Sequence, residues 1–170
     1  MDSLSRLEAR ASIEDSLRRY ARAVDRRDWA ALRSCYHPDA TDEHGEFSGA
    51  LEDFIDWVSK RHATVPFSAH FLGNCLIEFI DDKSAIVETY FVAIQRRANG
   101  ASGDVDTDVI GRYLDRFERR DGLWKVATRR VVYDGSRVVP SSFRPRTGKG
   151  TLGRRDLDDP LFALLRDTRR

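Results

Sequence analysis

A carboxylate stands at the end of an apolar helical stripe near the start of the sequence. In the segment YARAVDRRD, Tyr20, Ala21 and Val24 lie on one predicted helical face. Asp25 follows Ala21 by one helical turn, so it points toward the buried side near the helix end. A carboxylate there can bind a buried partner, although a solvated helix end beside two arginines explains it equally well. Tyr20 also fits two roles, a core residue with a satisfied hydroxyl or a member of a site.

One histidine lies in an equally apolar setting later in the chain. In the segment FSAHFLGNCLIEF, alternation places His70 on the same strand face as Leu72 and Leu76. A hydrogen-bonded core histidine is the ordinary explanation for a lone imidazole. If Asp25 on a covering helix reaches His70 on the sheet, the two form an Asp–His dyad. The carboxylate then fixes the tautomer, and the other ring nitrogen can accept a proton as a general base.

A cation late in the sequence could stabilise the negative charge that such a reaction produces. Arg129 lies in a predicted strand with Trp124 and Val126, and alternation predicts that it shares a face with Leu123 and Ala127. The sequence leaves open which face of this strand looks inward. If Arg129 looks inward, its guanidinium can stabilise a developing oxyanion or a departing hydroxide.

The remaining polar candidates indicate no metal or cofactor chemistry. Three acidic residues of predicted strands could supply a second acid or base, although exposed strand faces carry such residues routinely: Glu88, Asp106 and Asp108. Three histidines form neither an HxH nor an HExxH pair: His37, His44 and His62. The sequence has no phosphate-binding glycine loop and no GxSxG motif. We therefore predict no metal and no cofactor, and nucleotide chemistry and serine hydrolysis are disfavoured.

Helical segments dominate the first part of the chain. Apolar residues recur three or four positions apart from Ser3 to about Asp25, which predicts an amphipathic helix. Asp28 is a suitable N-cap for a short second helix from Trp29 to Cys35. A small hairpin around Gly45 is predicted next, followed by a third helix from Leu51 to Arg61.

Strands dominate the rest. Four segments are rich in aromatic and β-branched residues: Phe67 to Ile80, Ser84 to Arg97, Asp104 to Arg119 and Leu123 to Val139. Asn99-Gly100 and Asp121-Gly122 are the strongest hairpin signals between them, because these residues tolerate positive φ. Successive strands with short turns predict an antiparallel meander.

The predicted fold class is α+β, with N-terminal helices packed on one face of a curved antiparallel sheet. A sheet this long curls, and the helices close it into a cone. Residues 1–139 are predicted to form this domain. Residues 140–170 are predicted to be a loop or tail, rich in prolines, glycines and cations, with a possible short helix from Pro160 to Arg166 that docks on this subunit or on a neighbour.

The composition sets limits on partners and location. The 170 residues are enough for one domain that buries roughly 70% of its unfolded surface. Twenty-nine basic and 28 acidic side chains leave a charge of +1, so no global field attracts nucleic acid or a membrane. Cys35 and Cys75 lack zinc-site spacing and disulfide density, which predicts buried thiols and a cytoplasmic location. The N-terminus is charged where a signal peptide is apolar, and no run approaches the roughly 18 apolar residues of a membrane span.

Four motifs carry a resemblance to a known family: RASIEDSLRRYARAVDRRDW, DATDEHGEFSG, SAHFLGN and FERRDGLWKVATRR. With the order of predicted elements, they resemble the SnoaL-like branch of the nuclear transport factor 2 superfamily over about residues 2 to 139. Within it the chain is similar to hexachlorocyclohexane dehydrochlorinase, bile-acid 7α-dehydratase and scytalone dehydratase. The resemblance implies a cone-shaped, cystatin-like α+β barrel whose open end holds a hydrophobic small molecule.

The resemblance also implies roles for individual residues. In these lyases an aspartate at the position of Asp25 orients a histidine at the position of His70, which removes a proton from carbon while a leaving group departs. Tyr20 matches a tyrosine of the bile-acid enzyme, where the dehydrochlorinase has a lysine. Arg129 matches an active-site arginine of the dehydrochlorinase. Tyrosine at this place favours a dehydratase over a dehalogenase.

The predicted function is a cofactor-independent lyase that acts on a hydrophobic cyclic molecule with an acidic C–H bond beside a carbonyl. Tyr20 and Arg129 would polarise the carbonyl or the leaving group. An isomerase or cyclase that uses the same proton abstraction stays open. So do a non-catalytic β subunit of a ring-hydroxylating dioxygenase and a protein that only binds a hydrophobic ligand. The resemblance implies a homotrimer or homodimer through the exposed sheet face, without nucleic acid or membrane partners.

Overall fold

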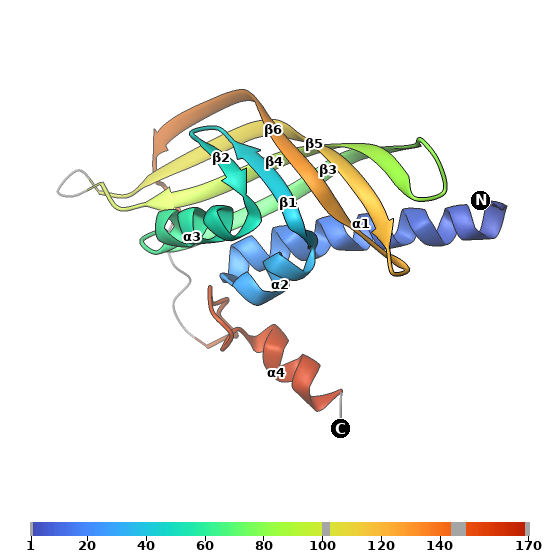
Figure 1. The fold of residues 1–170 in the computed structure, drawn as a ribbon. Coiled ribbons are helices and arrows are strands. Elements are labelled where there is room, and N and C mark those ends of the chain that lie inside the picture. Colours follow the sequence, from blue (N-terminus) through green and yellow to red (C-terminus); the bar gives the residue numbers. More distant parts are fainter. Residues whose placement is uncertain (1, 100–102, 144–148, 169–170) are drawn as a thin grey trace.

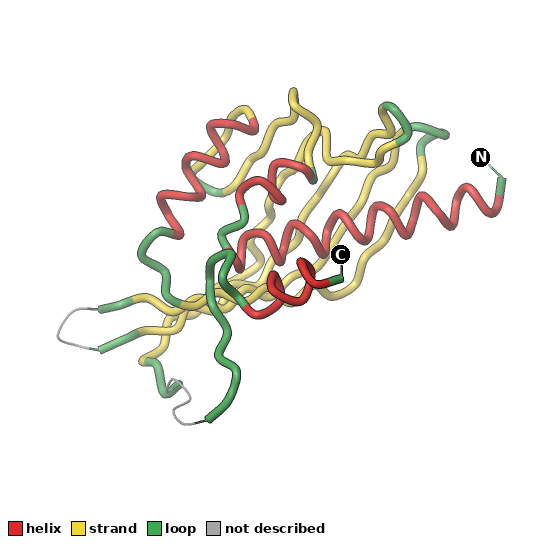
Figure 2. Tube along the Cα trace, turned by 90° about the horizontal axis from the view of Figure 1, so that it is seen from below, coloured by secondary structure: helices red, strands yellow, loops and turns green. Residues whose placement is uncertain are grey.

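The computed structural model describes residues 2–99, 103–143 and 149–168. Three N-terminal helices cover one face of a curved sheet (Figure 1): α1 (Ser3–Arg26), α2 (Trp29–Ser34) and α3 (Leu51–His62). The strands are β1 (Tyr36–His44), β2 (Phe47–Ala50), β3 (Phe67–Phe79), β4 (Ser84–Arg97), β5 (Val105–Arg120) and β6 (Leu123–Pro140). They form one six-stranded sheet in the order β2-β1-β6-β5-β4-β3. The view from the helical side shows these helices lying across the strands (Figure 2).

The α+β fold class and the antiparallel meander of the last four strands are confirmed. Each of the pairs β3–β4, β4–β5 and β5–β6 is antiparallel. One part of the prediction needs correction, because the sheet is mixed and open: β1 runs parallel to β6. The chain enters β1 directly from α2, and the parallel pairing brings the β1–β2 hairpin to the edge beside α3.

Local sequence signals explain where several elements begin and turn. Asp28 caps α2, since its side chain accepts a 2.9 Å hydrogen bond from the backbone N–H of Ala31. Asp121 and Gly122 have φ of 51° and 80°, the positive values that the predicted tight turn requires. Gly100 of the other predicted turn lies outside the described residues.

The core lies between the helical layer and the sheet. Ile13 of α1 and Phe54 of α3 are fully buried against sheet residues such as Val87 and Phe117, all at 0% exposure. Burial of each such side chain stabilises the folded state by roughly 1.5–3 kcal/mol. This packing holds the end of α1 against the sheet.

A bulge in β3 changes one predicted strand face. Leu72 pairs with Phe91 and Cys75 pairs with Thr89, so β3 has one residue more than β4 over this stretch. Leu72 packs against the core, but Leu76 beyond the bulge is 57% exposed. The prediction that His70 shares a face with Leu76 is therefore wrong, because the extra residue reverses the alternation.

The C-terminal segment returns to the end of α1. Helix α4 (Pro160–Asp167) lies on the side of α1 and α2 that faces away from the sheet (Figures 1 and 2). Asp159 caps this helix through Leu161 N, accepts a 2.8 Å bond from Arg154 N, and lies 3.3 Å from the Arg26 Nε atom. Residues of α4 itself are not buried.

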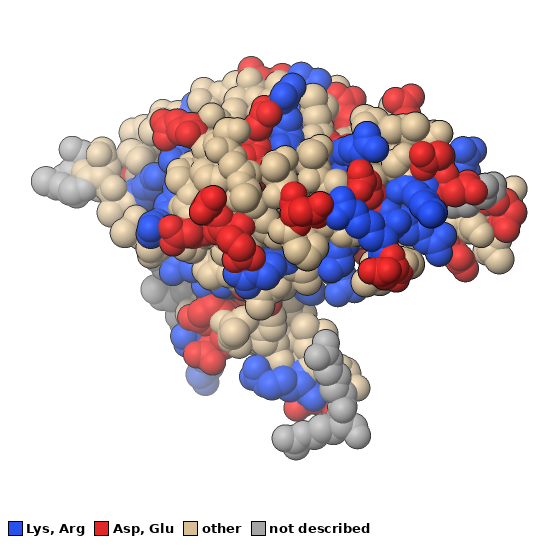
Figure 3. Space-filling view, in the orientation of Figure 1, with Lys and Arg blue, Asp and Glu red and all other residues tan. Residues whose placement is uncertain are grey.

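Charges of both signs share the surface. On the face shown in Figure 3, acidic and basic side chains are interspersed over the strands and helices, as the near-zero net charge of +1 predicts. Among the helices that the structure describes, none combines the length and the apolar character needed to cross a membrane.

Candidate active site

Asp25 and His70 are in direct contact. Asp25 lies in the last turn of α1, just before Arg27 ends the helix with a left-handed φ of 54°. Its Oδ1 atom is 2.7 Å from His70 Nδ1 and accepts a 2.9 Å bond from Ser68 Oγ. Its Oδ2 atom accepts a 2.9 Å bond from the backbone N–H of His70. The predicted pairing of the two residues is thus present, with the carboxylate fixed by three bonds from β3.

This geometry determines which nitrogen of His70 is available. A carboxylate only accepts hydrogen bonds, so Nδ1 of His70 carries the proton in the contact with Asp25. The side chains are 8% and 13% exposed, which keeps both almost free of bulk water. In the described ranges His70 Nε2 has no protein partner, so it is the nitrogen that can accept a proton.

A partly open cavity of about 80 Å³ lies beside the imidazole. Its wall comes from α1, α3 and the sheet, and it includes Tyr20, His44, Trp57, Arg61, His62, His70, Phe91, Gln95, Tyr113 and Tyr133. The volume holds a few water molecules and is smaller than the roughly 300–1,000 Å³ of ligand pockets. An open groove of about 440 Å³ between α1 and β3 also reaches Asp25 and His70. A cyclic molecule therefore needs wall side chains to move, or it approaches along the groove.

Tyr20 is both a core residue and part of the cavity wall. It is 2% exposed, and its ring meets those of Tyr36 and Tyr113 edge-on at 6.0 and 5.7 Å. Burial raises the pKa of the hydroxyl above its ordinary value of 10, although nearby Arg129 acts in the opposite direction. The Tyr20 hydroxyl is therefore a hydrogen-bond donor at neutral pH.

Arg129 looks inward, but it lies behind the cavity wall. Its side chain is fully buried and forms two bonds to Asp115, of 2.7 and 2.6 Å. Its guanidinium carbon is 4.1 Å from the ring centre of Tyr20 and 4.2 Å from that of Tyr113. The structure therefore does not bring Arg129 to His70 directly, because the two tyrosines separate it from the cavity.

The face of Arg129 corrects the prediction from alternation. Thr128 pairs with Arg116 and Val126 pairs with Phe117, which leaves Ala127 as an extra residue in β6. Beyond this bulge Arg129 lies on the buried face with Trp124 and Val126, whereas Leu123 is 58% exposed. Nothing in the segment LWKVATRRVV, which has no glycine or proline, marks this bulge.

The three acidic residues proposed as a second acid or base lie in ion pairs elsewhere. Glu88 binds Arg112 at 2.8 Å, Asp106 binds Arg96 at 2.8 Å, and Asp108 binds Arg137 at 2.7 Å. They are not part of the cavity wall. Over the residues that the structure describes, no group of three or more His, Cys, Asp or Glu side chains is placed to bind a metal ion.

Two histidines that the sequence analysis weighs only as metal ligands, His44 and His62, line the cavity. His44 stacks on Phe54 at 5.3 Å, and its Nδ1 lies 3.3 Å from the buried Asp42. His62 is the last residue of α3 and is 4% exposed. The predicted helix ended at Arg61, and one more residue would have placed His62 on the apolar stripe.

Comparisons with known proteins agree with this architecture. A family model for the SnoaL-like domain matches residues 5–130. A search of curated proteins gave no significant match. A hexachlorocyclohexane dehydrochlorinase (LinA-type3) from Novosphingobium barchaimii is similar in structure, with a TM-score of 0.76 and 20% identity, covering 85% of this chain and 100% of that one.

Two structures from Novosphingobium aromaticivorans are also similar. A proposed scytalone dehydratase has a TM-score of 0.70 and 20% identity, covering 85% of this chain and 100% of that one. The β subunit of a proposed aromatic-ring-hydroxylating dioxygenase has a TM-score of 0.60 and 19% identity, covering 76% and 91%. At these identities the likeness shows a shared fold. Because the family model covers most of the sequence, the chain belongs to the SnoaL-like domain family.

Proposed function

We propose that the protein is a cofactor-independent lyase that removes a carbon-bound proton from a hydrophobic cyclic molecule. The observation that carries the proposal is the 2.7 Å contact between Asp25 Oδ1 and His70 Nδ1 at the wall of a cavity. His70 is the general base, through Nε2, and Asp25 is the carboxylate that orients it. The likeness to a dehydrochlorinase and a proposed scytalone dehydratase supports this class of reaction.

The reaction begins at a C–H bond beside a carbonyl. His70 Nε2 takes the proton, and the electron pair of the C–H bond moves toward the carbonyl, which becomes an enolate. The enolate then re-forms the carbonyl and a C=C bond as it expels hydroxide from the neighbouring carbon. The hydroxide takes the proton back from His70 Nε2 and leaves as water, which restores the base. Tyr20 is protonated and lines the same cavity, and in this proposal it donates a hydrogen bond to one of these oxygens. Arg129 acts on the substrate indirectly, by holding and polarising Tyr20 from behind.

Solvent-deuterium incorporation tests the first step without knowledge of the natural substrate. The test compound is 2-tetralone, a cyclic ketone with acidic C–H bonds. Its mass would be followed with time in deuterium oxide. The wild-type chain should accelerate exchange, and His70→Ala should lose about 10² to 10⁴ of that acceleration. His37→Gln is the matched control, because the His37 imidazole is buried against the Glu118 carbonyl outside the cavity wall. Equal exchange with and without the His70 imidazole would contradict the proposal.

A dehydratase, an isomerase and a cyclase share this proton abstraction. Once exchange is established, chromatography of products from hydroxylated cyclic ketones separates them, since only the dehydratase releases water. We propose the dehydratase because Tyr20, which is protonated at neutral pH, lines the same cavity as His70 and could donate to a leaving hydroxyl.

The second candidate is a scaffold without catalysis, in the manner of a dioxygenase β subunit. The similarity to such a subunit favours it. A row of apolar residues also lies on the uncovered sheet face: Phe71, Val92 and Ile110 pair across β3, β4 and β5 and are 61%, 36% and 52% exposed. We propose that this row joins copies of the same chain.

The oligomeric state tests this proposal. Light scattering after size exclusion should give a dimer or trimer, and Val92→Lys should shift the population of molecules toward a monomer. A chain that stays monomeric until a larger subunit is co-expressed would favour the scaffold instead.

A further inference from the structure

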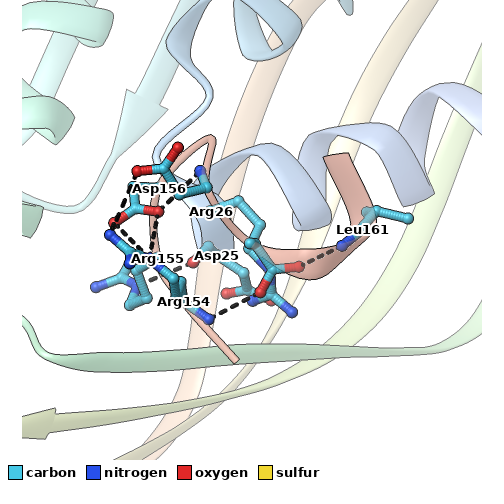
Figure 4. A network of polar contacts seen from close by, with 8 residues as sticks. Asp25, Arg26, Arg154, Arg155, Asp156 and Leu161 are labelled. Atoms are coloured by element: carbon cyan, nitrogen blue, oxygen red, sulfur yellow. Dashed lines mark hydrogen bonds and ion pairs between the residues drawn. The ribbon is translucent and has the colours of Figure 1, made fainter. Parts of the chain in front are cut away.

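An arginine of the C-terminal segment is inserted beside the dyad. Arg155 Nε donates to the Asp25 carbonyl at 2.9 Å, and Nη2 donates to the Val24 carbonyl at 3.0 Å. Nη1 donates to the Val65 carbonyl, and Nη2 also lies 3.0 Å from His62 Nδ1. Figure 4 shows the segment that carries Arg154, Arg155 and Asp156 against the end of α1 at Asp25. One guanidinium thus joins α1, α3 and the loop that leads from α3 into β3.

Arg155 and its neighbour Arg154 bind different chemical groups. Among the described residues, the Arg154 guanidinium binds the carboxylates of its own segment, Asp156 and Asp158. The Arg155 guanidinium meets backbone carbonyls, two of them at the C-terminal end of α1, where a cation is favourable. Burial lowers the pKa of Arg155 to about 10, so it stays charged at neutral pH. This half-buried cation therefore binds carbonyl oxygens and His62, without a carboxylate partner in the described segments.

The contact with Arg155 fixes the protonation of His62. A guanidinium has only donors, so His62 Nδ1 must accept and carries no proton. Burial lowers the pKa of His62 to about 3, and the charge of Arg155 acts in the same direction. The imidazole is therefore neutral at physiological pH, with its proton on Nε2.

The remaining nitrogen of His62 is available to a ligand. His62 shares the wall of the cavity with His70 and Tyr20. Its ring meets Trp29 edge-on at 6.3 Å, which holds it from a second side. Within residues 2–99, 103–143 and 149–168, no protein group is bonded to His62 Nε2. A neutral imidazole held in one tautomer can donate a hydrogen bond to an oxygen that gains negative charge.

We propose that His62 is a second imidazole of the site, which donates from Nε2–H to the carbonyl oxygen of the substrate, and that Arg155 is the positioning residue that holds it in this tautomer. This inference rests on the proposed function and specifies its substrate as a ketone or thioester whose enolate oxygen meets His62. His70 and His62 then have opposite roles: His70 accepts the carbon-bound proton, and His62 donates to the oxygen where the charge collects.

Nuclear magnetic resonance tests the tautomer without any activity. Two-bond ¹H–¹⁵N correlation spectra of the full chain, assigned with His62→Gln, should show His62 protonated at Nε2 and not titrating between pH 5 and 8. Arg155→Ala should give mixed tautomers and a pKa closer to the ordinary 6.5. Arg154→Ala is the matched control and should leave the His62 signals unchanged. A proton on Nδ1 in the wild type, or an unchanged tautomer in Arg155→Ala, would overturn the proposal.

Ligand binding and exchange test the donor role. The Nε2–H signal of His62 should move downfield on addition of 2-naphthol, whose oxygen imitates the enolate of 2-tetralone. In the deuterium exchange of 2-tetralone, His62→Phe should lose about 10² to 10³ of the acceleration, and His62→Gln less, because its amide can still donate. Loss of exchange in His70→Ala together with full exchange in His62→Phe would overturn this inference and leave the proposed function intact. Wild-type exchange no faster than that of His70→Ala would contradict the proposed function, while an unmoved Nε2–H signal with bound 2-naphthol would separately contradict the donor role.

Discussion

The Asp25 carboxylate accepts more hydrogen bonds than are needed to orient one imidazole. It accepts from Ser68 Oγ, His70 N and His70 Nδ1, so the side chain and the backbone of His70 are held by one group. Because Asp25 binds both the backbone N–H and the ring Nδ1 of His70, the imidazole keeps one orientation and one tautomer. This is the arrangement expected for a general base whose Nε2 must face one direction.

The two members of the dyad should differ in importance. We expect Asp25→Asn to lower kcat/KM for exchange by less than His70→Ala, because the amide keeps the size of the side chain and one hydrogen bond. Ser68→Ala is the matched control, since it removes one bond to the carboxylate and leaves the contact with His70 in place. Steady-state kinetics of the three variants measure this order, and a Ser68→Ala defect as large as that of Asp25→Asn would assign the effect to packing.

Tyr20 should contribute at every pH at which the protein is folded. Burial raises the pKa of its hydroxyl above 10, so the group stays protonated as the pH rises through that value. Tyr20→Phe should therefore lower the exchange rate without shifting the pH profile. Rates measured from pH 6 to 10 check this expectation. An alkaline fall in rate that disappears in Tyr20→Phe would show that the tyrosine ionises.

At the scale of elements, one buried ion pair connects β5, β6 and α1. Arg129 and Asp115 are both fully buried, and the guanidinium lies between the rings of Tyr20 and Tyr113. Burial raises the pKa of Asp115 in spite of the arginine, so the carboxylate depends on this partner to remain charged. The pair positions Tyr20 and holds the last turns of α1 over the sheet.

Removal of one partner of this pair should be costly. We expect Arg129→Leu to lower the free energy of unfolding by about 3–5 kcal/mol, because it leaves a buried carboxylate unpaired. The double variant Arg129→Leu with Asp115→Leu should recover much of this loss, since neither charge remains buried. Urea denaturation of both variants gives the comparison. A double variant no more stable than Arg129→Leu would attribute the loss to packing against the tyrosines.

Close approach of β5 and β6 explains a glycine beneath the cavity wall. A Cβ atom on Gly111 would lie 2.3 Å from the Val132 carbonyl oxygen and 2.9 Å from a ring carbon of Phe91, which lines the cavity. Gly111→Ala should therefore lower the free energy of unfolding by about 1–3 kcal/mol. Gly135→Ala is the control, because a Cβ atom at that position would meet no described atom within 4 Å. Denaturant unfolding measures both, and equal effects would contradict the steric reason.

At the scale of the whole molecule, the C-terminal segment is connected to the site through Arg155. The family model ends at residue 130 and α4 begins at Pro160, yet Arg155 between them binds the end of α1 and His62. The segment therefore touches the groups that surround the dyad. The division into a domain of residues 1–139 and a tail of 140–170 stays a prediction, in which the tail supplies Arg155 to the proposed site.

The buried neutral His62 should make folding sensitive to acid. Its pKa is about 3 in the folded chain, against an ordinary value of 6.5, so between these values the unfolded chain binds a proton that the folded chain does not. Above pH 6.5 this residue does not reduce the free energy of unfolding. As the pH decreases from 6.5 toward 3, the free energy of unfolding falls by up to about 1.4 kcal/mol per pH unit. His62→Gln should reduce this slope by the same amount. Urea unfolding at several pH values measures it, and an unchanged slope would show that His62 does not resist protonation.

The sequence alone determined the element types and the most important contact. Apolar spacing of three or four placed Asp25 on the sheet side of α1, and alternation placed His70 on a mostly apolar face of β3. Both rules act over one or two turns of helix or a few residues of strand, and no bulge lies between Ser68 and His70. These local patterns left the partner of each residue open, and the family resemblance implied the pairing, which is present at 2.7 Å.

Only the tertiary structure decided what surrounds that contact. The bulges at Leu72–Cys75 and Ala127 arise from pairing with neighbouring strands, so alternation failed for Leu76 and for the face of Arg129. The cavity of about 80 Å³ depends on how side chains from three elements fill one space. The bond from Arg155 to His62 joins residues 93 positions apart, and no local pattern contains such information, because the distance between them is set by the packing of the whole chain.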